Sequence, residues 1–369
     1  MTIPEHMRAV VTTGHGGLDK LEFHDDWPTP KFEADEILIE VGACGVNNTD
    51  INTRIGWYDK SVREGTTVER GEGGFDFHES STGGWGDSGI SFPRIQGADV
   101  CGRVVALGPG APGDLMGQRV LVDTWLRDWN DPDNFNKCRY FGSEVDGGFA
   151  EFAKAPVKNV HPVNSDLSDA ELATFATSSI TAENMLRRAE VKPGDVVLIP
   201  GASGGVGSAL IQLARRRGAV PVAMCSEAKA AQVRKIGAEA VLPRAPSDLP
   251  SELEAAIGSA RVDVVADVVG GTLWPQLIEV LRRGGCYTCA GAIAGPMVDF
   301  DLRTFYLNDL IFTGATTIPA GLFAELVGYI ERGEIKPLLA GTWPLEALPE
   351  AQTAFLKKHH VGNFVIVPK

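Results

Sequence analysis

The sequence predicts an α/β protein of two domains, one built on a doubly wound parallel sheet and the other on an irregular β-barrel. Three observations predict this fold. From Lys192 onward, apolar runs alternate with helical patterns, as in parallel sheets with crossover helices. A glycine-rich turn at 201–207 follows the first of these runs and opens a helix. The first 155 residues instead hold short β-rich runs broken by Gly and Pro.

Length and composition agree with two soluble domains. The chain has 369 residues, of which 44% are hydrophobic and 22% charged, which is ordinary globular usage. The formal net charge of −14 opposes binding to nucleic acid or to anionic membranes, which needs clustered Lys and Arg. The start lacks the pattern of a secretory signal, and no apolar run reaches the roughly 20 residues that span a bilayer. We therefore expect a cytoplasmic protein with no nucleic-acid or membrane partner.

The N-terminal part and the tail are expected to form one domain. Residues 36–42 and 102–108 have the pattern of short strands, and residues 59–92 form a Gly- and Ser-rich stretch typical of a long loop or lid. In the tail, residues 345–358 have an amphipathic helix pattern and 364–367 that of a closing strand. The predicted domains are then 1–155 together with 316–369, and the inserted 156–315.

The inserted domain shows the clearest pattern, in which strands and helices follow one another. The expected strands are 195–201, 220–225, 240–242, 263–269, 286–290 and 310–315, and the expected helices are 206–217, 227–236 and 273–283. A doubly wound sheet of this kind binds dinucleotides at the carboxyl ends of its strands.

The glycine-rich turn predicts the phosphate-binding part of that site. Gly204 and Gly205 have no side chains, so the backbone can approach a pyrophosphate, and Gly207 lets helix and strand pack closely. The start of the following helix supplies amide donors and the positive end of its dipole.

The end of the second strand predicts which nicotinamide cofactor is bound. NAD enzymes place an acidic residue there, against the ribose hydroxyls. Here Ser226 and Lys229 leave room and positive charge for a 2′-phosphate, which favours NADPH. Glu227 keeps NADH open as the alternative, because a shift of one residue would place its carboxylate on the ribose.

The six cysteines are interpreted as reduced thiols, since they are scattered through a chain of this size. Cys286 and Cys289 have the spacing of a metal or redox pair. Their segment reads as a buried strand, however, in which residues three apart point to opposite faces. We expect both to be core residues.

Several segments together resemble the medium-chain dehydrogenase/reductase superfamily along nearly the whole chain. They are Ala43-Cys-Gly-Val-Asn-Asn-Thr-Asp50, Gly97-Ala-Asp-Val-Cys-Gly102, Asp146-Gly-Gly-Phe-Ala-Glu151, the glycine-rich turn, and His360-Val-Gly-Asn363. The resemblance implies a GroES-like β-barrel catalytic domain, a Rossmann domain, an active site between them, and a homodimer or homotetramer.

The zinc enzymes of this superfamily have ligands at positions that here hold Asn47, Ala98 and Thr177. None of the three offers a thiolate or imidazole, and catalytic zinc needs three protein donors. The structural zinc lobe is represented by Cys138 alone. We therefore expect no metal. A metal site at Asp76, His78 and Glu79 in the long loop is a weaker alternative.

The chain is more similar to the zinc-free quinone oxidoreductase-like branch, which implies roles for particular residues. Asn47 would hold the nicotinamide ribose or a substrate oxygen, Asp50 would order its loop, and Tyr58 would donate to a substrate carbonyl. A capped turn is the plain structural alternative for Asn47 and Asp50, as packing is for Tyr58. The implied cofactor contacts are Asn47, Thr181, Ser203, Gly204, Gly205, Val206, Gly207, Ser226, Lys229, Val269, Gly291 and Asn363. Asn363 replaces the usual Lys.

The expected activity is transfer of hydride from NADPH to a quinone or another activated alkene or carbonyl compound. Such acceptors need no metal to polarise them, whereas oxidation of a plain alcohol does. Three alternatives stay open: a reductase of enoyl thioesters or 2-alkenals, an NADPH-binding sensor or structural protein with little turnover, and an alcohol dehydrogenase with atypical zinc ligands. The long stretch after Tyr58 is expected to shape the substrate entrance, with Trp57, Trp85, Trp125 or Trp129 as aromatic walls.

Overall fold

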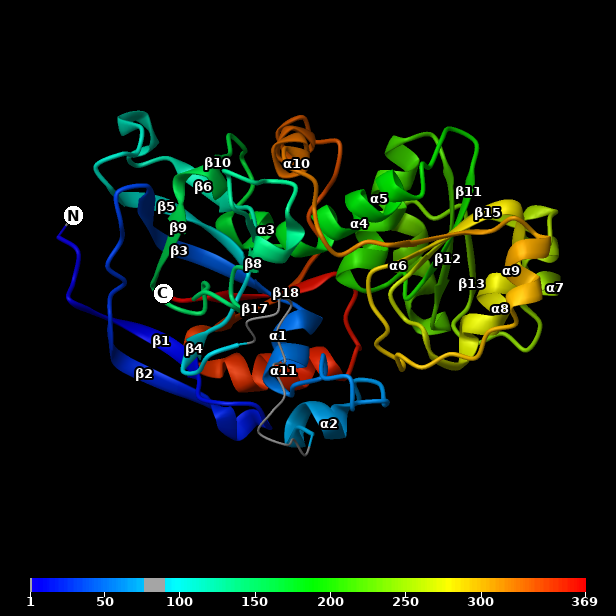
Figure 1. Cartoon of the computed structure of the whole chain (residues 1–369), viewed down its shortest axis with the longest axis horizontal. Coiled ribbons are helices and arrows are strands. Elements are labelled where there is room, and N and C mark those ends of the chain that lie inside the picture. The colour runs from blue at the N-terminus through cyan, green and yellow to red at the C-terminus, as the bar shows by residue number, and fades with distance from the viewer. Residues whose placement is uncertain (1, 76–89) are drawn as a thin grey trace.

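The protein has two lobes that lie side by side and are joined by the helix α4 (Ala176–Arg188) (Figure 1). The structure is a computed structural model and describes residues 2–75 and 90–369. Both lobes pack helices against sheets, as the sequence predicts.

A six-stranded, wholly parallel sheet forms the centre of one lobe. Its order is β13-β12-β11-β14-β15-β16. The strands are β11 (Val196–Pro200), β12 (Val220–Cys225), β13 (Ala240–Pro243), β14 (Val262–Asp267), β15 (Leu281–Cys289) and β16 (Ile311–Gly314). The helices of this lobe are α5 (Gly205–Arg216), α6 (Glu227–Ile236), α7 (Leu249–Ile257), α8 (Trp274–Glu279) and α9 (Leu302–Leu307). This is the Rossmann-type doubly wound sheet that the alternating pattern predicts.

Most of these elements lie where the sequence places them, but one helix was predicted too long. The helix expected at 273–283 ends at Glu279, and β15 begins at Leu281. Leu281 pairs with Val262 of β14 and is buried, so sheet pairing outweighs the helical preference of the Leu-Arg-Arg run. Helices α7 and α9 were not predicted.

The other lobe is the GroES-like barrel. Its main sheet has the order β10-β6-β5-β3-β18-β17, and β9 also pairs with β3. These strands are β3 (Glu36–Val46), β5 (Asp99–Leu107), β6 (Arg119–Val122), β9 (Phe152–Pro156), β10 (Val160–Pro162), β17 (Leu339–Pro344) and β18 (Asn363–Val367). Smaller sheets are formed by β1 (His6–Thr12), β2 (Leu21–Pro28) and β4 (Arg94–Ile95), and by β7 (Trp125–Leu126) and β8 (Arg139–Tyr140).

The tail pairs with the first lobe: β18 lies antiparallel to β3 and parallel to β17. The helix expected at 345–358 is a short 3-10 turn at Leu345–Ala347 followed by α11 (Leu348–Leu356). The exact boundaries between the two domains stay a prediction.

Short helices on the barrel meet at a buried arginine. They are α1 (Asn48–Arg54), α2 (Val68–Gly73) and α11 (Figure 1). Two further helices are α3 (Asp169–Leu172), beside the main sheet of the barrel, and α10 (Leu322–Glu331), which packs on α4. Arg54 is fully buried and donates to the carbonyl oxygens of Gly16 and Gly71 and to Gln352 Oε1. A buried guanidinium needs such partners, and here it ties α1 to α2 and α11.

The core consists of three clusters of buried apolar residues. Cys286 belongs to one cluster, and Cys289 packs against another on the opposite side of the sheet. Both thiols are free, so the interpretation of the pair as core residues is confirmed. No helix in residues 2–75 or 90–369 is long and apolar enough to cross a membrane.

Candidate active site

The glycine-rich loop joins β11 to α5 and lies at the junction of the two lobes. Gly201 has a φ of 67°, a left-handed conformation that favours glycine, and Gly204 caps α5. A Cβ on Gly207 would overlap the backbone of Gly201 and Ala202, as expected for a glycine that lets strand and helix pack closely. A Cβ on Gly204 would meet only the Gly201 oxygen, at an ordinary 3.6 Å.

Asn363, the first residue of β18, packs against this loop and supports it. Its Oδ1 accepts from Ser178 Oγ at 2.9 Å, and its Nδ2 donates to the Thr174 carbonyl at 3.2 Å. A Cβ on Gly205 would overlap both Asn363 and Ser178. Asn363 is therefore a buried support beneath the loop, and the absence of a side chain at Gly205 makes room for it.

The hydroxyl of Ser226 lies just after β12, and the cationic side chains of Lys229 and Arg244 lie near it. Ser226 precedes α6, and its hydroxyl makes no capping hydrogen bond. Lys229 Nζ donates to Ser203 Oγ at 3.3 Å and to the Lys358 carbonyl. Burial lowers the pKa of Lys229, and the nearby Arg244 adds to that effect. Arg244 follows β13, whose last residue pairs with the end of β12, and Glu227 is exposed.

Lys358 is a second, half-buried cation at this place, and the sequence patterns did not single it out. Its Nζ donates to Asn48 Oδ1 at 2.7 Å and lies 3.7 Å from the centre of the Phe355 ring. Burial lowers the pKa of Lys358 to about 7, and the charge of Lys229 lowers it further. Lys358 thus links Lys229 of α6 to the first residue of α1.

Asn47 and Asp50 form the capped turn that starts α1. The Asn47 backbone N–H donates to Asp50 Oδ2 at 2.7 Å, which completes a capping box. Burial raises the pKa of the Asp50 carboxyl to about 8, although its bond to Asn47 lowers it, and Asp99 adds to the rise. Asn47 is 7% exposed. Its Nδ2 lies beside the Asp99 carboxylate, whose pKa it lowers, but it completes no well-formed hydrogen bond within the described structure. This amide is a donor available to a ligand.

Tyr58 lies against the same helix. Its hydroxyl bonds to Thr49 and Asn52, and its ring meets that of Trp57 edge to face at 5.5 Å. Burial raises the pKa of Tyr58 to about 12, so the phenol keeps its proton at any physiological pH. The structure therefore brings Tyr58, Asn47 and Asp50 together around α1.

The three positions that hold zinc ligands in zinc enzymes of the superfamily are Asn47, Ala98 and Thr177 in this chain, and the side chain of Asp99 lies among them. Thr177 donates from its backbone N–H, at 2.9 Å, and from its hydroxyl to Asp99 Oδ1. Ala98, in the second position, is buried and has no polar side chain. No group of three or more His, Cys, Asp or Glu side chains in the described ranges could hold a metal ion. The donor set therefore does not fit catalytic zinc.

The remaining predicted contacts follow the carboxyl ends of the parallel strands. Val269 and Gly291 each lie two residues beyond the ends of β14 and β15, and Val206 lies in the first turn of α5. Thr181 is half-buried, one turn along α4 from Thr177. Asp76, His78, Glu79 and Trp85 lie outside the described residues.

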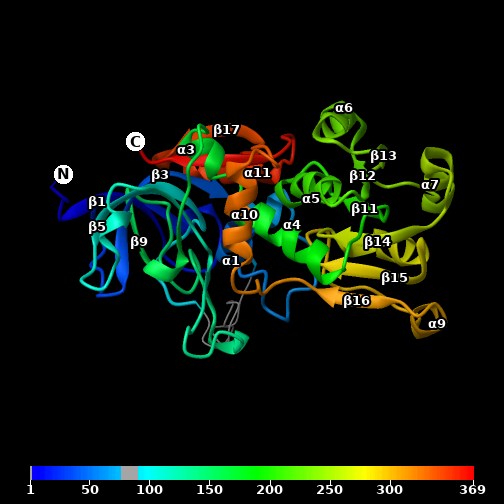
Figure 2. The ribbon, with the colours of Figure 1, turned by 90° about the horizontal axis from the view of Figure 1, so that it is seen from above.

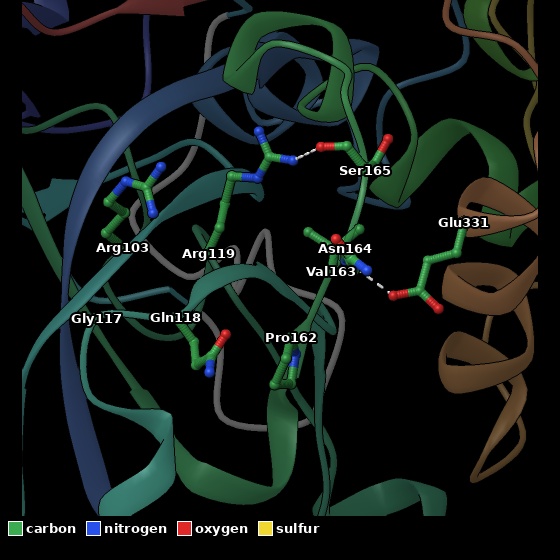
Figure 3. A pocket seen from close by; sticks show the side chains of 9 residues that line it. All are labelled: Arg103, Gly117, Gln118, Arg119, Pro162, Val163, Asn164, Ser165 and Glu331. Atoms are coloured by element: carbon green, nitrogen blue, oxygen red, sulfur yellow. Dashed lines mark hydrogen bonds between the residues drawn. The ribbon is translucent and has the colours of Figure 1, made fainter.

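A cavity of about 460 Å³ opens at a different place, on the outer side of the barrel beside α10 (Figure 3). Arg103, Arg119 and Gln118 line one side, and Glu331 reaches across to the backbone N–H of Asn164 at 2.9 Å. None of the predicted site residues lines it.

Comparison with known proteins agrees with this geometry. Residues 33–165 match the family model described as "Alcohol dehydrogenase GroES-like domain", and residues 205–331 match the one described as "Zinc-binding dehydrogenase". A crystal structure described as a "putative alcohol dehydrogenase from Sinorhizobium meliloti 1021" is 45% identical, with a TM-score of 0.89 over 100% of this chain and 98% of that one.

Three further relatives have names that refer to different activities. An NAD-dependent alcohol dehydrogenase of Sulfurisphaera tokodaii is 26% identical over 98% of this chain and 100% of that protein. Acryloyl-coenzyme A reductase of Metallosphaera sedula is 25% identical over 98% and 99%. Quinone oxidoreductase of Rattus norvegicus is 25% identical over 94% and 92%.

Proposed function

Because this chain belongs to the medium-chain dehydrogenase/reductase superfamily, we propose that it is an NADPH-dependent oxidoreductase that reduces quinones or other activated alkenes without zinc. The observation that carries the proposal is the donor set at the position of the family's catalytic metal. Asn47, Ala98 and Thr177 provide an amide, a methyl group and a hydroxyl, and these cannot lower the pKa of an alcohol as zinc does. An acceptor that is already electrophilic does not need that help.

The loop and the cations at the end of β12 would hold the cofactor. The pyrophosphate would lie on the amide groups at the start of α5, where the backbone is open at Gly204. A 2′-phosphate would lie near Ser226 and Lys229, with Arg244 and Lys358 adding positive charge. When bound, the reduced nicotinamide would supply the hydride.

The chain's own residues would then orient the acceptor and stabilise charge on its oxygen. The buried Asn47 amide has an N–H left to donate, and Tyr58 keeps its phenolic proton, so both can donate to a carbonyl or quinone oxygen. Asp50 would hold Asn47 in place through the capping box of α1. These roles combine orientation with electrostatic stabilisation.

An enoyl thioester is the second candidate for the acceptor. It is favoured by the similarity to acryloyl-coenzyme A reductase along almost the whole of both chains. The chemistry would be the same, because a thioester carbonyl activates the adjacent double bond.

Replacing Tyr58 by Phe should lower kcat by about 10-fold while the affinity for NADPH stays unchanged, since one hydrogen bond to the developing charge is lost. Steady-state kinetics with a quinone or enone, together with fluorescence titration of NADPH, measure both quantities. An unchanged kcat would remove Tyr58 from the mechanism.

The proposed activity is tested by following NADPH oxidation at 340 nm across quinones, enones, alkenals and enoyl thioesters. We expect at least one class to accelerate oxidation strongly, and the class with the highest kcat/KM identifies the acceptor. Tight NADPH binding with no accelerated oxidation by any class would instead support a sensor or structural protein.

We propose further that two copies associate through β16, the edge strand of the parallel sheet (Figure 2). Large apolar side chains are exposed on and beside this strand: Leu302, Tyr306, Leu307, Ile311 and Phe312. An open strand edge with such side chains favours pairing with another copy. Sedimentation velocity should give the mass of a dimer or tetramer, and a monomer at micromolar concentration would contradict this.

A further inference from the structure

A chain of three hydrogen-bonded side chains runs inward from the predicted active site. Tyr140 Oη and Thr177 Oγ1 lie 2.9 Å apart, and the Thr177 hydroxyl also bonds to Asp99. Asp99 is 1% and Tyr140 4% exposed, whereas Thr177 is only half-buried. Thr177 is thus the member of the chain that a ligand can reach.

Thr177 is held rigidly, and it lies beside the cofactor loop. Its backbone N–H and its hydroxyl both bond to Asp99, and Tyr140 fixes the hydroxyl from another side. The next residue, Ser178, donates to Asn363, which supports Gly205. A hydroxyl fixed in this way is already positioned for proton transfer to a molecule bound next to the loop.

The groups that surround Asp99 favour the protonated form of its carboxyl group. The titratable groups that face it are Asp50 from α1, Cys44 from β3 and Tyr140 from β8, and each of these is acidic or neutral. Burial raises the pKa of Asp99 to about 6, although the adjacent Asn47 amide and the two bonds from Thr177 lower it. The carboxyl can therefore store a proton near neutral pH and release it.

We propose that the Thr177 hydroxyl delivers the proton that completes the reduction, and that Asp99 replaces that proton. The proposal rests on the proposed function. The hydride that a bound reduced nicotinamide would supply would add to the β-carbon of the activated alkene, and the electron pair of the double bond would move to form an enolate. The α-carbon of the enolate then takes the proton of the Thr177 O–H.

As that O–H bond breaks, the proton of the Asp99 carboxylic acid moves to Thr177 Oγ1. Asp99 is left as a carboxylate, and it regains a proton from water through Thr177 after the product has left. The net change is the addition of one hydride and one solvent proton across the double bond. Tyr140 keeps its proton throughout and acts as a positioning residue for the hydroxyl.

Replacing Thr177 by Val tests the relay, because valine has a similar shape but no hydroxyl. We expect kcat to fall by about 100-fold, in the range usual for loss of a general acid, with the Kd of NADPH unchanged. T177S should recover most of kcat. T288V is the matched control, since it removes another buried threonine hydroxyl, from β15, and should leave kcat unchanged.

The pH profile and solvent isotope effect separate a relay from a merely structural role. The proton donor is present below the pKa of Asp99 and is lost as pH rises through it, so the wild-type kcat should fall above about pH 6. T177V and D99N should lack this fall and should show a smaller solvent deuterium effect on kcat.

Wild-type kcat and an unchanged solvent isotope effect in T177V would overturn the relay while leaving the proposed function intact. If T177V lost NADPH affinity by the same factor as kcat, Thr177 would be a structural residue, and this result would also overturn the relay. If the wild-type protein reduces no acceptor, the proposed function fails, and the relay fails with it.

Discussion

Replacing Gly205 by Ala should weaken NADPH binding by more than 10-fold and lower the stability of the protein by about 1–3 kcal/mol, the usual cost of overfilling a packed site. The added methyl group would overlap Asn363 and Ser178, which bond to each other directly beneath the loop. Either the loop or the tail must move, and in both cases the amide groups at the start of α5 leave their positions. Thermal unfolding and fluorescence titration of NADPH measure the two effects.

Replacing Gly204 by Ala is the matched control, because the two glycines are adjacent but face different surroundings. A methyl group at Gly204 would make one ordinary contact, 3.6 Å from the Gly201 oxygen, so the stability should not change. NADPH affinity should nevertheless fall, since Gly204 is where the pyrophosphate would approach. Equal melting temperatures for G205A and the wild type would contradict the packing described here.

Replacing Lys229 by Met should weaken NADPH binding by about 10- to 100-fold and leave NADH binding unchanged. A hydrogen bond between charged groups contributes about 1.5–3 kcal/mol, and only NADPH carries the 2′-phosphate that would form it. The Lys229 ammonium lies 3.3 Å from the Ser203 hydroxyl of the loop, so one phosphate could accept hydrogen bonds from both groups.

Titration of both cofactors against K229M and K235M isolates that contact. Lys235 is exposed near the end of the same helix, so its loss changes net charge without touching the site. An equal loss of NADH and NADPH affinity in K229M would indicate general damage. If the wild-type protein binds NADH more tightly than NADPH, the prediction of NADPH as the cofactor is wrong, and Glu227 is the residue expected to bind the ribose hydroxyls.

The nucleotide-binding lobe could be predicted closely because its signals are local. Helix α6 and strand β12 have the predicted bounds, since an apolar run and a helical pattern lie next to each other in the sequence. The helix predicted at 273–283 failed where tertiary pairing decided the structure: Leu281 joins the sheet through Val262.

The parts of the site that were missed are held by contacts between distant segments. Asp99 and Thr177 are 78 residues apart, and Lys229 and Lys358 are 129 residues apart. No spacing rule in one sequence brings such pairs together. Asn363 shows the same limit: its position in a motif indicates a cofactor contact, which stays a prediction, and its buried bonds to Ser178 and Thr174, which support the loop, could not be foreseen.

The absence of a catalytic metal is the central claim, and metal removal tests it most directly. The purified protein would be assayed with NADPH and the best acceptor before and after treatment with a strong zinc chelator, and its zinc content would be measured by mass spectrometry. We predict less than 0.1 zinc per chain, on the order expected for a site without thiolate or imidazole donors, and equal activity in both samples. Stoichiometric zinc, together with an alcohol-dependent reduction of NAD or NADP that the chelator abolishes, would contradict the account.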